Sequence, residues 1–327
     1  SIGRVTGCTP HWPTNMLWLA VVALVFTLIV TVALWWFGAW NPPRRREIAN
    51  DFPVFQELPK VMHVAHRGGS HMGPQNTMHT YKRAVREFNV DVLEIDLQLS
   101  SDGTVVLIHD PQVDITTSGS GSVAHMSVDR LQELDAAYWF TEDGGFTYPL
   151  RDQGITVPTF EEVLDEFEDK PKLVFFLDFK SVDAVEPALR MVAQRGLEKR
   201  VILGAVLPSV NKQVLLHRHP ASPVVADALT MLKMILLYAV GLLWLFPIQH
   251  QVLGGILMKR TRFLMTERFL KSLRLTGCKV AVFGPDVNSE EDIQYLMDVG
   301  VHMVVTDSPH VMRRLLDVNK EMEAPAL

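Results

Sequence analysis

The chain has 327 residues, of which 48% are hydrophobic and 21% are charged, and its formal net charge is −6 at pH 7. This composition excludes an intrinsically disordered chain and predicts a large buried core. The acidic balance argues against a nucleic-acid-binding protein, and the two cysteines, Cys8 and Cys278, exclude a disulfide framework.

The first predicted element is an uncharged apolar run at residues 17–40, with tryptophans near both ends. At about 1.5 Å per residue, a helix of this length crosses the roughly 30 Å hydrocarbon core of a bilayer. A signal peptide would have a shorter apolar region and a cleavage site of small residues, which does not follow here. We therefore expect one N-terminal transmembrane helix at 17–40, with 1–16 as its flank and 41–60 as a linker.

The arginines around this run give its orientation. Arg44, Arg45 and Arg46 follow it, whereas only Arg4 precedes it. Because cytosolic flanks carry the excess of positive charge, the count favours a cytosolic catalytic domain.

After the linker, short apolar runs alternate with amphipathic stretches. The predicted strands are 61–66, 91–97, 104–109, 172–179, 200–205 and 279–283, with a weaker one at 301–305. The predicted helices are 77–88, 160–167, 182–195, 262–275 and 290–298. This alternation over about 255 residues predicts a parallel α/β fold of the size of a TIM (β/α)8 barrel. We expect the barrel at 61–316 and a tail at 317–327.

A second apolar stretch, residues 231–248, contains Lys233 and has Pro247 near its end. It could be a very apolar core helix, a membrane-dipping or lipid-binding insertion, or a membrane span. A span would place the two parts of one barrel on opposite sides of the membrane. The leucine and aromatic content favours an insertion, so we expect an apolar membrane- or lipid-facing element at 228–258.

Four of the predicted strands end in residues that can carry out chemistry. These residues are His66 with Arg67, Glu94 with Asp96, His109 with Asp110, and Asp178 with Lys180. Each pair alone is common in structural positions. Because catalytic residues of parallel α/β folds gather at the carboxyl ends of strands, the joint pattern predicts one active site.

The carboxylates predict a metal. Glu94 and Asp96 point the same way because side chains alternate along a strand. Their mutual repulsion calls for a cation or a proton. With Asp178 they suit one hard divalent cation, Mg²⁺ or Ca²⁺, and both ions stay open because both prefer oxygen ligands.

The remaining residues predict phosphoryl transfer. Arg67 and Lys180 can bind phosphate oxygens. His66 and His109 can supply a general acid and a general base, and the order of these two roles stays open. The sequence therefore predicts a metal-assisted phosphoryl-transfer site.

At these residues the sequence resembles the glycerophosphodiester phosphodiesterase family, in order over about residues 61–316. The motifs that carry the resemblance are Ala65-His66-Arg67-Gly68-Gly69, Pro74-Gln75-Asn76-Thr77, Leu93-Glu94-Ile95-Asp96-Leu97, Ile108-His109-Asp110, Leu177-Asp178-Phe179-Lys180 and Thr306-Asp307-Ser308-Pro309. The resemblance implies a TIM barrel with an insertion at 110–160. It also implies His66 and His109 as acid and base, Glu94, Asp96 and Asp178 as metal ligands, and Arg67 and Lys180 as phosphate ligands.

Three positions depart from the family's usual pattern. Gln75 and Asp178 stand where the family usually has glutamates, and Phe283 stands near a usual tryptophan, followed by Asn288. We expect Gln75, Asn76 and Phe283 to support the site or to line the substrate.

The apolar segments resemble the membrane-anchored eukaryotic branch that acts on lysophospholipids. This resemblance implies a lysophospholipase D that releases lysophosphatidic acid and a headgroup alcohol. Hydrolysis of soluble glycerophosphodiesters and a catalytically silent, lipid-binding membrane protein stay open as alternatives. The expected partners are the substrate and membrane lipids, without nucleic acid, and the expected location is an endomembrane such as the endoplasmic reticulum. The oligomeric state is not predicted.

Overall fold

The computed structural model describes residues 14–40, 51–243, 250–256 and 265–323. The chain divides into two units. The first consists of Ser1–Pro43 and Met234–Phe246, and the second of Arg44–Lys233 and Pro247–Leu327.

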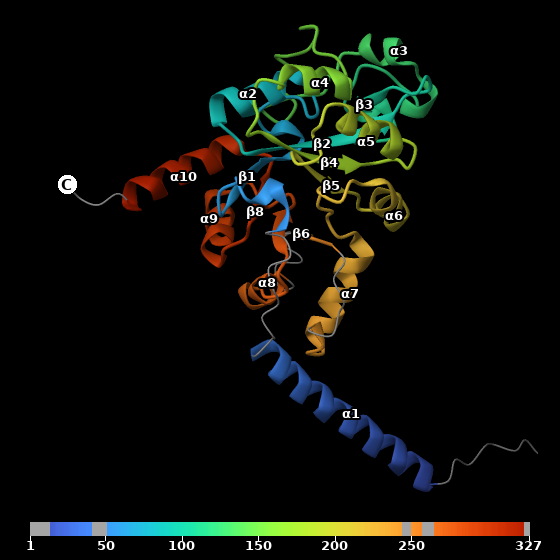
Figure 1. The fold of residues 1–327 in the computed structure, drawn as a ribbon, viewed down its shortest axis with the longest axis vertical. Helices are drawn as coiled ribbons and strands as arrows, with labels where there is room; N and C mark the ends of the chain where they lie inside the picture. The colour runs from blue at the N-terminus through green and yellow to red at the C-terminus, as the bar shows by residue number, and fades with distance from the viewer. Residues whose placement is uncertain (1–13, 41–50, 244–249, 257–264, 324–327) are drawn as a thin grey trace, which may run out of the picture. The chain divides into compact units, whose positions relative to one another are not determined.

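In the first unit, helix α1 spans Thr14–Trp40 (Figure 1). Its side chains are described over residues 18–33, where nearly all are exposed. Within the described ranges, no helix combines the length and the apolar character that a membrane crossing requires.

The second unit is built on a curled sheet of parallel strands. Their order is β5-β4-β2-β1-β8-β7-β6. The bounds are β1 (Met62–Ala65), β2 (Val92–Leu99), β4 (Val174–Phe179), β5 (Val201–Gly204), β6 (Val252–Ile256), β7 (Lys279–Phe283) and β8 (Met303–Thr306). Two parallel bridges, Leu203 to Val224 and Val225 to Val252, connect the edge strands β5 and β6 through residues 224–225. The fold is therefore TIM-barrel-like, which confirms the predicted architecture in this coarser form.

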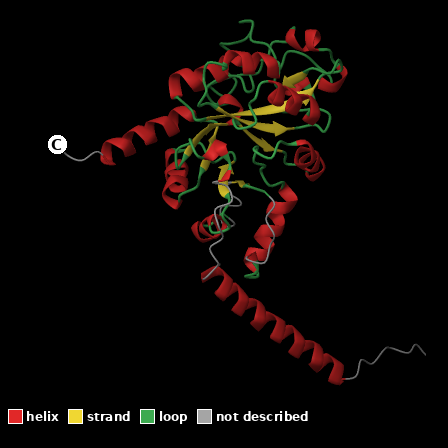
Figure 2. Cartoon of the chain, in the orientation of Figure 1, coloured by secondary structure: helices red, strands yellow, loops and turns green. Residues whose placement is uncertain are grey.

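Helices of the second unit lie around the sheet, as Figure 2 shows in red around the yellow strands. They are α2 (Met78–Phe88), α4 (Phe160–Glu166), α5 (Val185–Gln194), α6 (Pro208–His217), α8 (Glu267–Arg274), α9 (Glu290–Val299) and α10 (Pro309–Glu323). Helix α7 (Ala228–Ala239) begins in the second unit, and its residues from Met234 on belong to the first. Side-chain caps begin several of them; Thr159 and Glu162 form a capping box at the start of α4. Helix α10 continues past residue 316, where the sequence predicts the tail to begin.

The interior of the barrel changes from apolar to polar along the strands. One buried cluster contains Met62 and Val64 of β1, Val92 of β2, and Val305 of β8, together with Val54 and Phe55 of the short helix Pro53–Phe55. Because side chains alternate along a strand, the next residues on these inward faces lie closer to the carboxyl ends. They are His66, Glu94, Asp96 and Asp307, so the alternation itself directs polar groups into one end of the barrel.

Two strands differ from the sequence prediction. The strand predicted at 104–109 forms as β3 (Val105–Leu107), but it pairs antiparallel with β2 and is not a barrel strand. The interval 228–258, predicted as one lipid-facing element, contains α7 and the buried strand β6. Barrel strands are buried on both faces, so the apolar run at 252–256 could not be distinguished from lipid-facing sequence by composition. Residues 244–249 and 257–258 of this predicted element, and residues 262–264 of the helix predicted at 262–275, lie outside the described residues.

Between β3 and α4, where the insertion at 110–160 is predicted, lie two short 3-10 helices, Val113–Ile115 and Val123–His125, and α3 (Val128–Gln132). Val113, Val123 and Leu131 from these elements pack with Val106 of β3 in a small buried cluster.

Candidate active site

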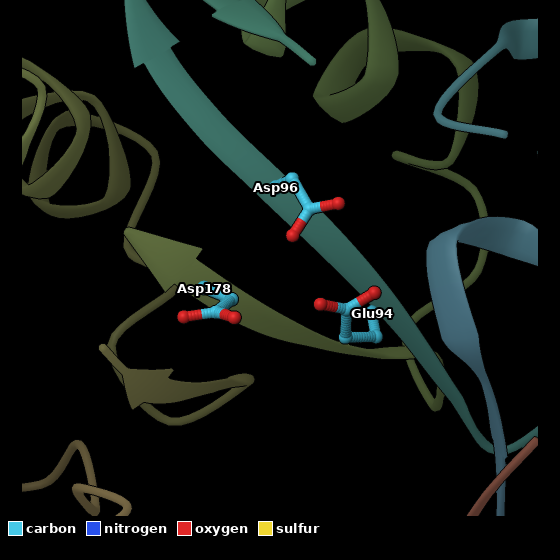
Figure 3. Close-up of side chains that lie close together, drawn as sticks. All are labelled: Glu94, Asp96 and Asp178. Carbon is cyan, nitrogen blue, oxygen red and sulfur yellow. The ribbon is translucent and has the colours of Figure 1, made fainter. Parts of the chain in front are cut away.

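Three carboxylates meet inside the barrel. Glu94 and Asp96 project from β2, and Asp178 projects from the neighbouring strand β4, where it is the register partner of Asp96. One oxygen atom of each residue lies within 4.8 Å of the others, and Figure 3 shows the three side chains grouped together along the two neighbouring strands. The donor set and its spacing fit a divalent cation with oxygen ligands.

The electrostatics of the cluster also fit a cation. Burial, followed by the negative charge of Asp96, raises the pKa of Glu94. Burial likewise raises the pKa of Asp178. Burial acts to raise the pKa of Asp96 too, but the Lys180 and Arg67 cations outweigh it and lower that pKa. When all three carboxylates are ionised, they face only the two cations Arg67 and Lys180, so a divalent cation fits the remaining negative charge.

Lys180 is held by two of these carboxylates. Its Nζ atom lies 2.6 Å from Asp178 Oδ2 and 2.9 Å from Asp96 Oδ1. Asp178 and Lys180 are two residues apart, so both side chains leave the chain on the same side where β4 ends. The lysine places a positive charge at the expected position of a substrate phosphate.

Arg67 is fixed through both its backbone and its side chain. Its φ of 52° lies in the left-handed region, which is uncommon for a residue other than glycine. The conformation directs the Arg67 amide to donate to Glu94 Oε2 at 2.7 Å, while Nε lies 3.3 Å from Asp96 Oδ2. Arg67 Nη1 donates to Gln75 Oε1 at 2.6 Å, so the glutamine contacts Arg67.

Asn76 orients Asp96. Its Nδ2 atom donates to Asp96 Oδ2 at 2.7 Å, and its Oδ1 atom accepts from the Asp96 amide at 3.2 Å. The buried Tyr81 hydroxyl donates to the same Asn76 Oδ1 at 2.8 Å. The Pro-Gln-Asn-Thr segment thus supports the site through two consecutive side chains, Gln75 to Arg67 and Asn76 to Asp96.

The two histidines each contact a carboxylate through Nδ1. His66 Nδ1 lies 2.7 Å from Asp307 Oδ1, and His109 Nδ1 lies 3.0 Å from Asp110 Oδ1. Burial opposes protonation of His66, but the hydrogen bond to Asp307 and the negative charges of Glu94 and Asp307 together outweigh burial and raise the pKa of His66. Burial lowers the pKa of His109, and Lys180 and Arg67 lower it further against the attraction of Asp96.

His109 reaches the site by a different route from the other residues. It follows β3, which runs antiparallel to β2 with Leu107 opposite Leu97. The chain after β3 therefore returns along β2, and the Ile108 amide donates to the Asp96 carbonyl at 3.2 Å. His109 joins the cluster because of this hairpin and not because a parallel strand ends there.

The arrangement combines carboxylates, two cations and two histidines, and the comparisons with known proteins assign it to a family. The model of the glycerophosphoryl diester phosphodiesterase family matches residues 66–311, which is well over half of the chain. The chain belongs to this family. The predicted resemblance at family level is confirmed.

Relatives in this family carry the same description. The glycerophosphodiester phosphodiesterase of Bacillus subtilis (strain 168) is 28% identical over 279 residues, covering 78% of this chain and 86% of that protein. Glycerophosphodiester phosphodiesterase 1 of Mus musculus is 31% identical over 173 residues, covering 52% of this chain and 48% of that protein.

Solved structures share the fold. The glycerophosphoryl diester phosphodiesterase domain of an uncharacterized protein from Mycobacterium tuberculosis superposes with a TM-score of 0.65 at 22% identity, covering 78% of this chain and 99% of that chain. A phosphodiesterase of Oleispira antarctica, in complex with the product sn-glycerol-3-phosphate, gives 0.62 at 19% identity, covering 81% and 99%.

Two further residues of this family member complete the description. Phe283, predicted as a lining residue, packs against the inner barrel cluster at the end of β7. Asp307 was not predicted as a site residue, although it lies within one of the family motifs. The buried run Met303–Thr306 could have indicated it, because alternation places Met303, Val305 and Asp307 on one face.

Proposed function

We propose that this member of the glycerophosphoryl diester phosphodiesterase family hydrolyses lysophospholipids on the headgroup side of the phosphate. The products would be lysophosphatidic acid and the headgroup alcohol. The observation that carries the phosphodiesterase part of the proposal is the convergence of Glu94, Asp96 and Asp178 inside the barrel. The cations Arg67 and Lys180 and the two histidines extend this group into a site for phosphate chemistry.

In this proposal Arg67 and Lys180 bind the phosphate. Arginine offers two parallel donors to phosphate oxygens, and lysine adds a point charge. Glu94, Asp96 and Asp178 would hold one Mg²⁺ or Ca²⁺, which supplies charge neutralisation at a phosphate oxygen. Asn76 keeps Asp96 in place for that purpose.

His109 and His66 move the protons. At neutral pH the lowered pKa of His109 suits a base, and the raised pKa of His66 suits an acid. The free glycerol hydroxyl loses its proton to His109 as its oxygen bonds to phosphorus. The bond between phosphorus and the headgroup oxygen breaks, and His66 protonates that oxygen. Water then opens the cyclic phosphate with the two histidines in reversed roles.

Exposed apolar side chains support the lysophospholipid preference. We define the apolar rim as Val182, Val206, Leu207, Leu229, Leu232 and Ile256, all of which are exposed. Val182, Val206, Leu207 and Ile256 lie at or within three residues of the carboxyl ends of β4, β5 and β6. Leu229 and Leu232 lie in the first two turns of α7, which begins three residues after the bridging residues 224–225. Asp178 also lies near the carboxyl end of β4, so the rim and the carboxylate cluster are at the same end of the strands. Burying an acyl chain contributes about 0.8 kcal/mol per CH₂, so a rim of this kind favours a lipid over a water-soluble diester.

The test compares lysophosphatidylcholine with glycerophosphocholine for the detergent-purified protein and for the double variant Leu229→Ser/Leu232→Ser. Loss of about 1.4 kcal/mol of apolar contact lowers kcat/KM for the lysolipid roughly tenfold. The value for glycerophosphocholine stays unchanged. Leu216→Ser, on an exposed leucine near the end of α6, is the matched control because α6 runs away from the rim. An equal effect of the double variant on both substrates would contradict the lysophospholipid preference.

A second candidate is hydrolysis of soluble glycerophosphodiesters to glycerol 3-phosphate and an alcohol. The names of the relatives and the product bound in the Oleispira antarctica enzyme favour it. Faster turnover of glycerophosphocholine than of the lysolipid would select this candidate. Binding of lysolipid vesicles without turnover of any glycerophosphodiester would select the silent, lipid-binding protein.

We also propose that residues 17–40 anchor the protein in an endomembrane such as the endoplasmic reticulum, with the barrel on the cytosolic side. The proposal rests on the uncharged apolar sequence and on Arg44, Arg45 and Arg46 after it. We expect the protein to resist extraction by alkaline carbonate. In sealed microsomes, we expect added protease to digest the barrel. Release by carbonate would contradict the anchor, and protection from protease would contradict the orientation.

A further inference from the structure

The hydrogen bond between His66 and Asp307 follows from the register of two strands. β1 and β8 pair in parallel, with Ala65 opposite Thr306. The next residues, His66 and Asp307, are therefore side by side at the carboxyl ends of these strands. Their side chains meet at 2.7 Å between His66 Nδ1 and Asp307 Oδ1.

Asp307 is itself held on both oxygens. The Ser70 hydroxyl donates to Oδ1 at 2.5 Å, and Asn288 Nδ2 donates to Oδ2 at 3.1 Å. Asn288 Oδ1 in turn accepts from the Asp307 amide at 2.8 Å and from the Thr306 hydroxyl at 2.9 Å. The carboxylate thus accepts from side-chain donors on both of its oxygens, and its orientation is fixed before any substrate binds.

An ionised carboxylate can only accept, so the proton of this bond must lie on His66 Nδ1. Burial acts to raise the pKa of Asp307, but its hydrogen bonds with His66, Ser70 and Asn288 outweigh burial and hold the pKa far below its usual value. In a neutral His66, Nε2 is then the free acceptor, and in a charged His66 it is a donor.

We infer that Asp307 is a positioning residue that holds His66 with Nδ1 protonated, so that Nε2 is the nitrogen that exchanges protons with the substrate. The inference rests on the proposed function for the role of that proton, while the geometry that carries it is independent of the substrate. Ser70 and Asn288 act one step further out by fixing the Asp307 carboxylate.

Asp307→Asn is the discriminating variant because it keeps the shape and changes the donors. If the amide oxygen accepts from Asn288, the new NH₂ group faces His66 and Ser70. His66 Nδ1 then becomes an acceptor, and the proton moves to Nε2. If the amide is reversed, two NH₂ groups face each other. The first arrangement avoids that clash, so the variant selects the opposite tautomer.

The test combines kinetics with nitrogen NMR of the full chain, labelled with ¹⁵N-histidine in detergent and assigned by His66→Gln. For wild type we expect a proton bonded to His66 Nδ1. For Asp307→Asn we expect the proton on Nε2, a kcat for lysophosphatidylcholine lower by about 10²–10⁴-fold, and a KM changed by less than about threefold. Ser70→Ala should lower kcat by about tenfold or less, because one neutral donor is lost.

Asp91→Asn is the matched control. Asp91 accepts from the His63 amide at 2.8 Å and lies just before β2, at the opposite end of that strand from Asp96. The kcat of Asp91→Asn should stay within about threefold of the wild-type value, even if the variant is less stable than wild type. A neutral wild-type His66 with its proton on Nε2 and none on Nδ1 would overturn the inference, and this spectrum needs no folded variant. A kcat of Asp307→Asn no lower than that of Asp91→Asn would overturn it as well. Absence of turnover by wild type on every diester would overturn the proposed function and leave the spectrum to decide the tautomer.

Discussion

Asp96 and Asp178 are register partners on neighbouring parallel strands, so a buried carboxylate and a partly buried one lie side by side inside the barrel. Such a pair is unstable without positive charge between its members. Lys180 contributes one ammonium group to both. Glu94 adds a third carboxylate, and burial together with the negative charge of Asp96 raises its pKa.

Mg²⁺ or Ca²⁺ should stabilise the protein, because an ion that binds only the folded state adds its binding energy to folding. At one hundred times its Kd the gain is about 2.7 kcal/mol, equivalent to several degrees in Tm. Thermal unfolding with a chelator and then with added metal measures the shift. Asp178→Asn should abolish it, whereas Asp298→Asn, on an exposed residue of α9, should retain it. An equal shift in both variants would place the metal elsewhere.

Removal of the Lys180 charge should destabilise the fold. Lys180→Met leaves Asp96 and Asp178 without their shared cation, and breaking a buried ion pair costs about 3–5 kcal/mol. Urea unfolding in the absence of metal measures the loss. Lys170→Met is the matched control, because Lys170 pairs with Asp169 on the surface and should cost less than about 1 kcal/mol. Equal losses for the two variants would contradict the role of Lys180 in the cluster.

Activity should survive replacement of Gln75 by glutamate but not by an apolar residue. Gln75→Glu keeps an oxygen acceptor for Arg67 Nη1, so kcat/KM should change by less than about threefold. Gln75→Leu removes that acceptor, and misplacing Arg67 by an ångström should lower kcat/KM about 10²-fold. Steady-state kinetics of the two variants give the comparison. An unchanged Gln75→Leu would show that Arg67 needs no support from this position.

Acid should destabilise the protein partly through His63. This residue is 1% exposed. Burial, with a smaller contribution from Arg313, lowers the pKa of His63 from 6.5 to about 3. Below pH 6.5 the unfolded chain binds a proton on His63 that the folded chain does not bind. The contribution of His63 to the free energy of unfolding is therefore fully present at higher pH and is lost as pH falls towards 3. The loss between about pH 7 and pH 4.5 amounts to about 3 kcal/mol.

His63→Leu should therefore flatten the dependence of the unfolding free energy on pH over this range. His125→Leu, on an exposed residue of the insertion, should leave the slope as in wild type. Urea unfolding at a series of pH values measures both. A slope in His63→Leu as steep as in wild type would assign the acid sensitivity to other groups.

Much of the site could be predicted from the sequence, because its chemistry follows strand alternation. Glu94 with Asp96, and Asp178 with Lys180, are spaced by two residues, so each pair must share a face. His66 and Arg67 directly follow a buried apolar run. The metal and phosphate roles of these residues stay predictions, but the structure brings the residues together as the spacing requires.

Other features depend on tertiary structure that spacing does not encode. The antiparallel direction of β3 comes from a tight return of the chain, and a three-residue strand carries no signal of its direction. The strand β6 is short, contains two glycines and follows another apolar segment, so it was included in the predicted lipid-facing element. Asp307 acquires its role only through the pairing of β1 with β8, which joins residues 241 positions apart.

We propose that the carboxylate cluster, with His66 and His109, cleaves the bond between phosphorus and the headgroup oxygen. Phosphorus NMR of lysophosphatidylcholine, incubated with the purified full chain and divalent metal, tests it directly because the two possible phosphomonoesters give separate signals. We expect lysophosphatidic acid and choline from wild type, with rates lower by about 10²–10⁴-fold in His66→Ala and His109→Ala. Formation of phosphocholine, or undiminished turnover in either histidine variant, would contradict the claim.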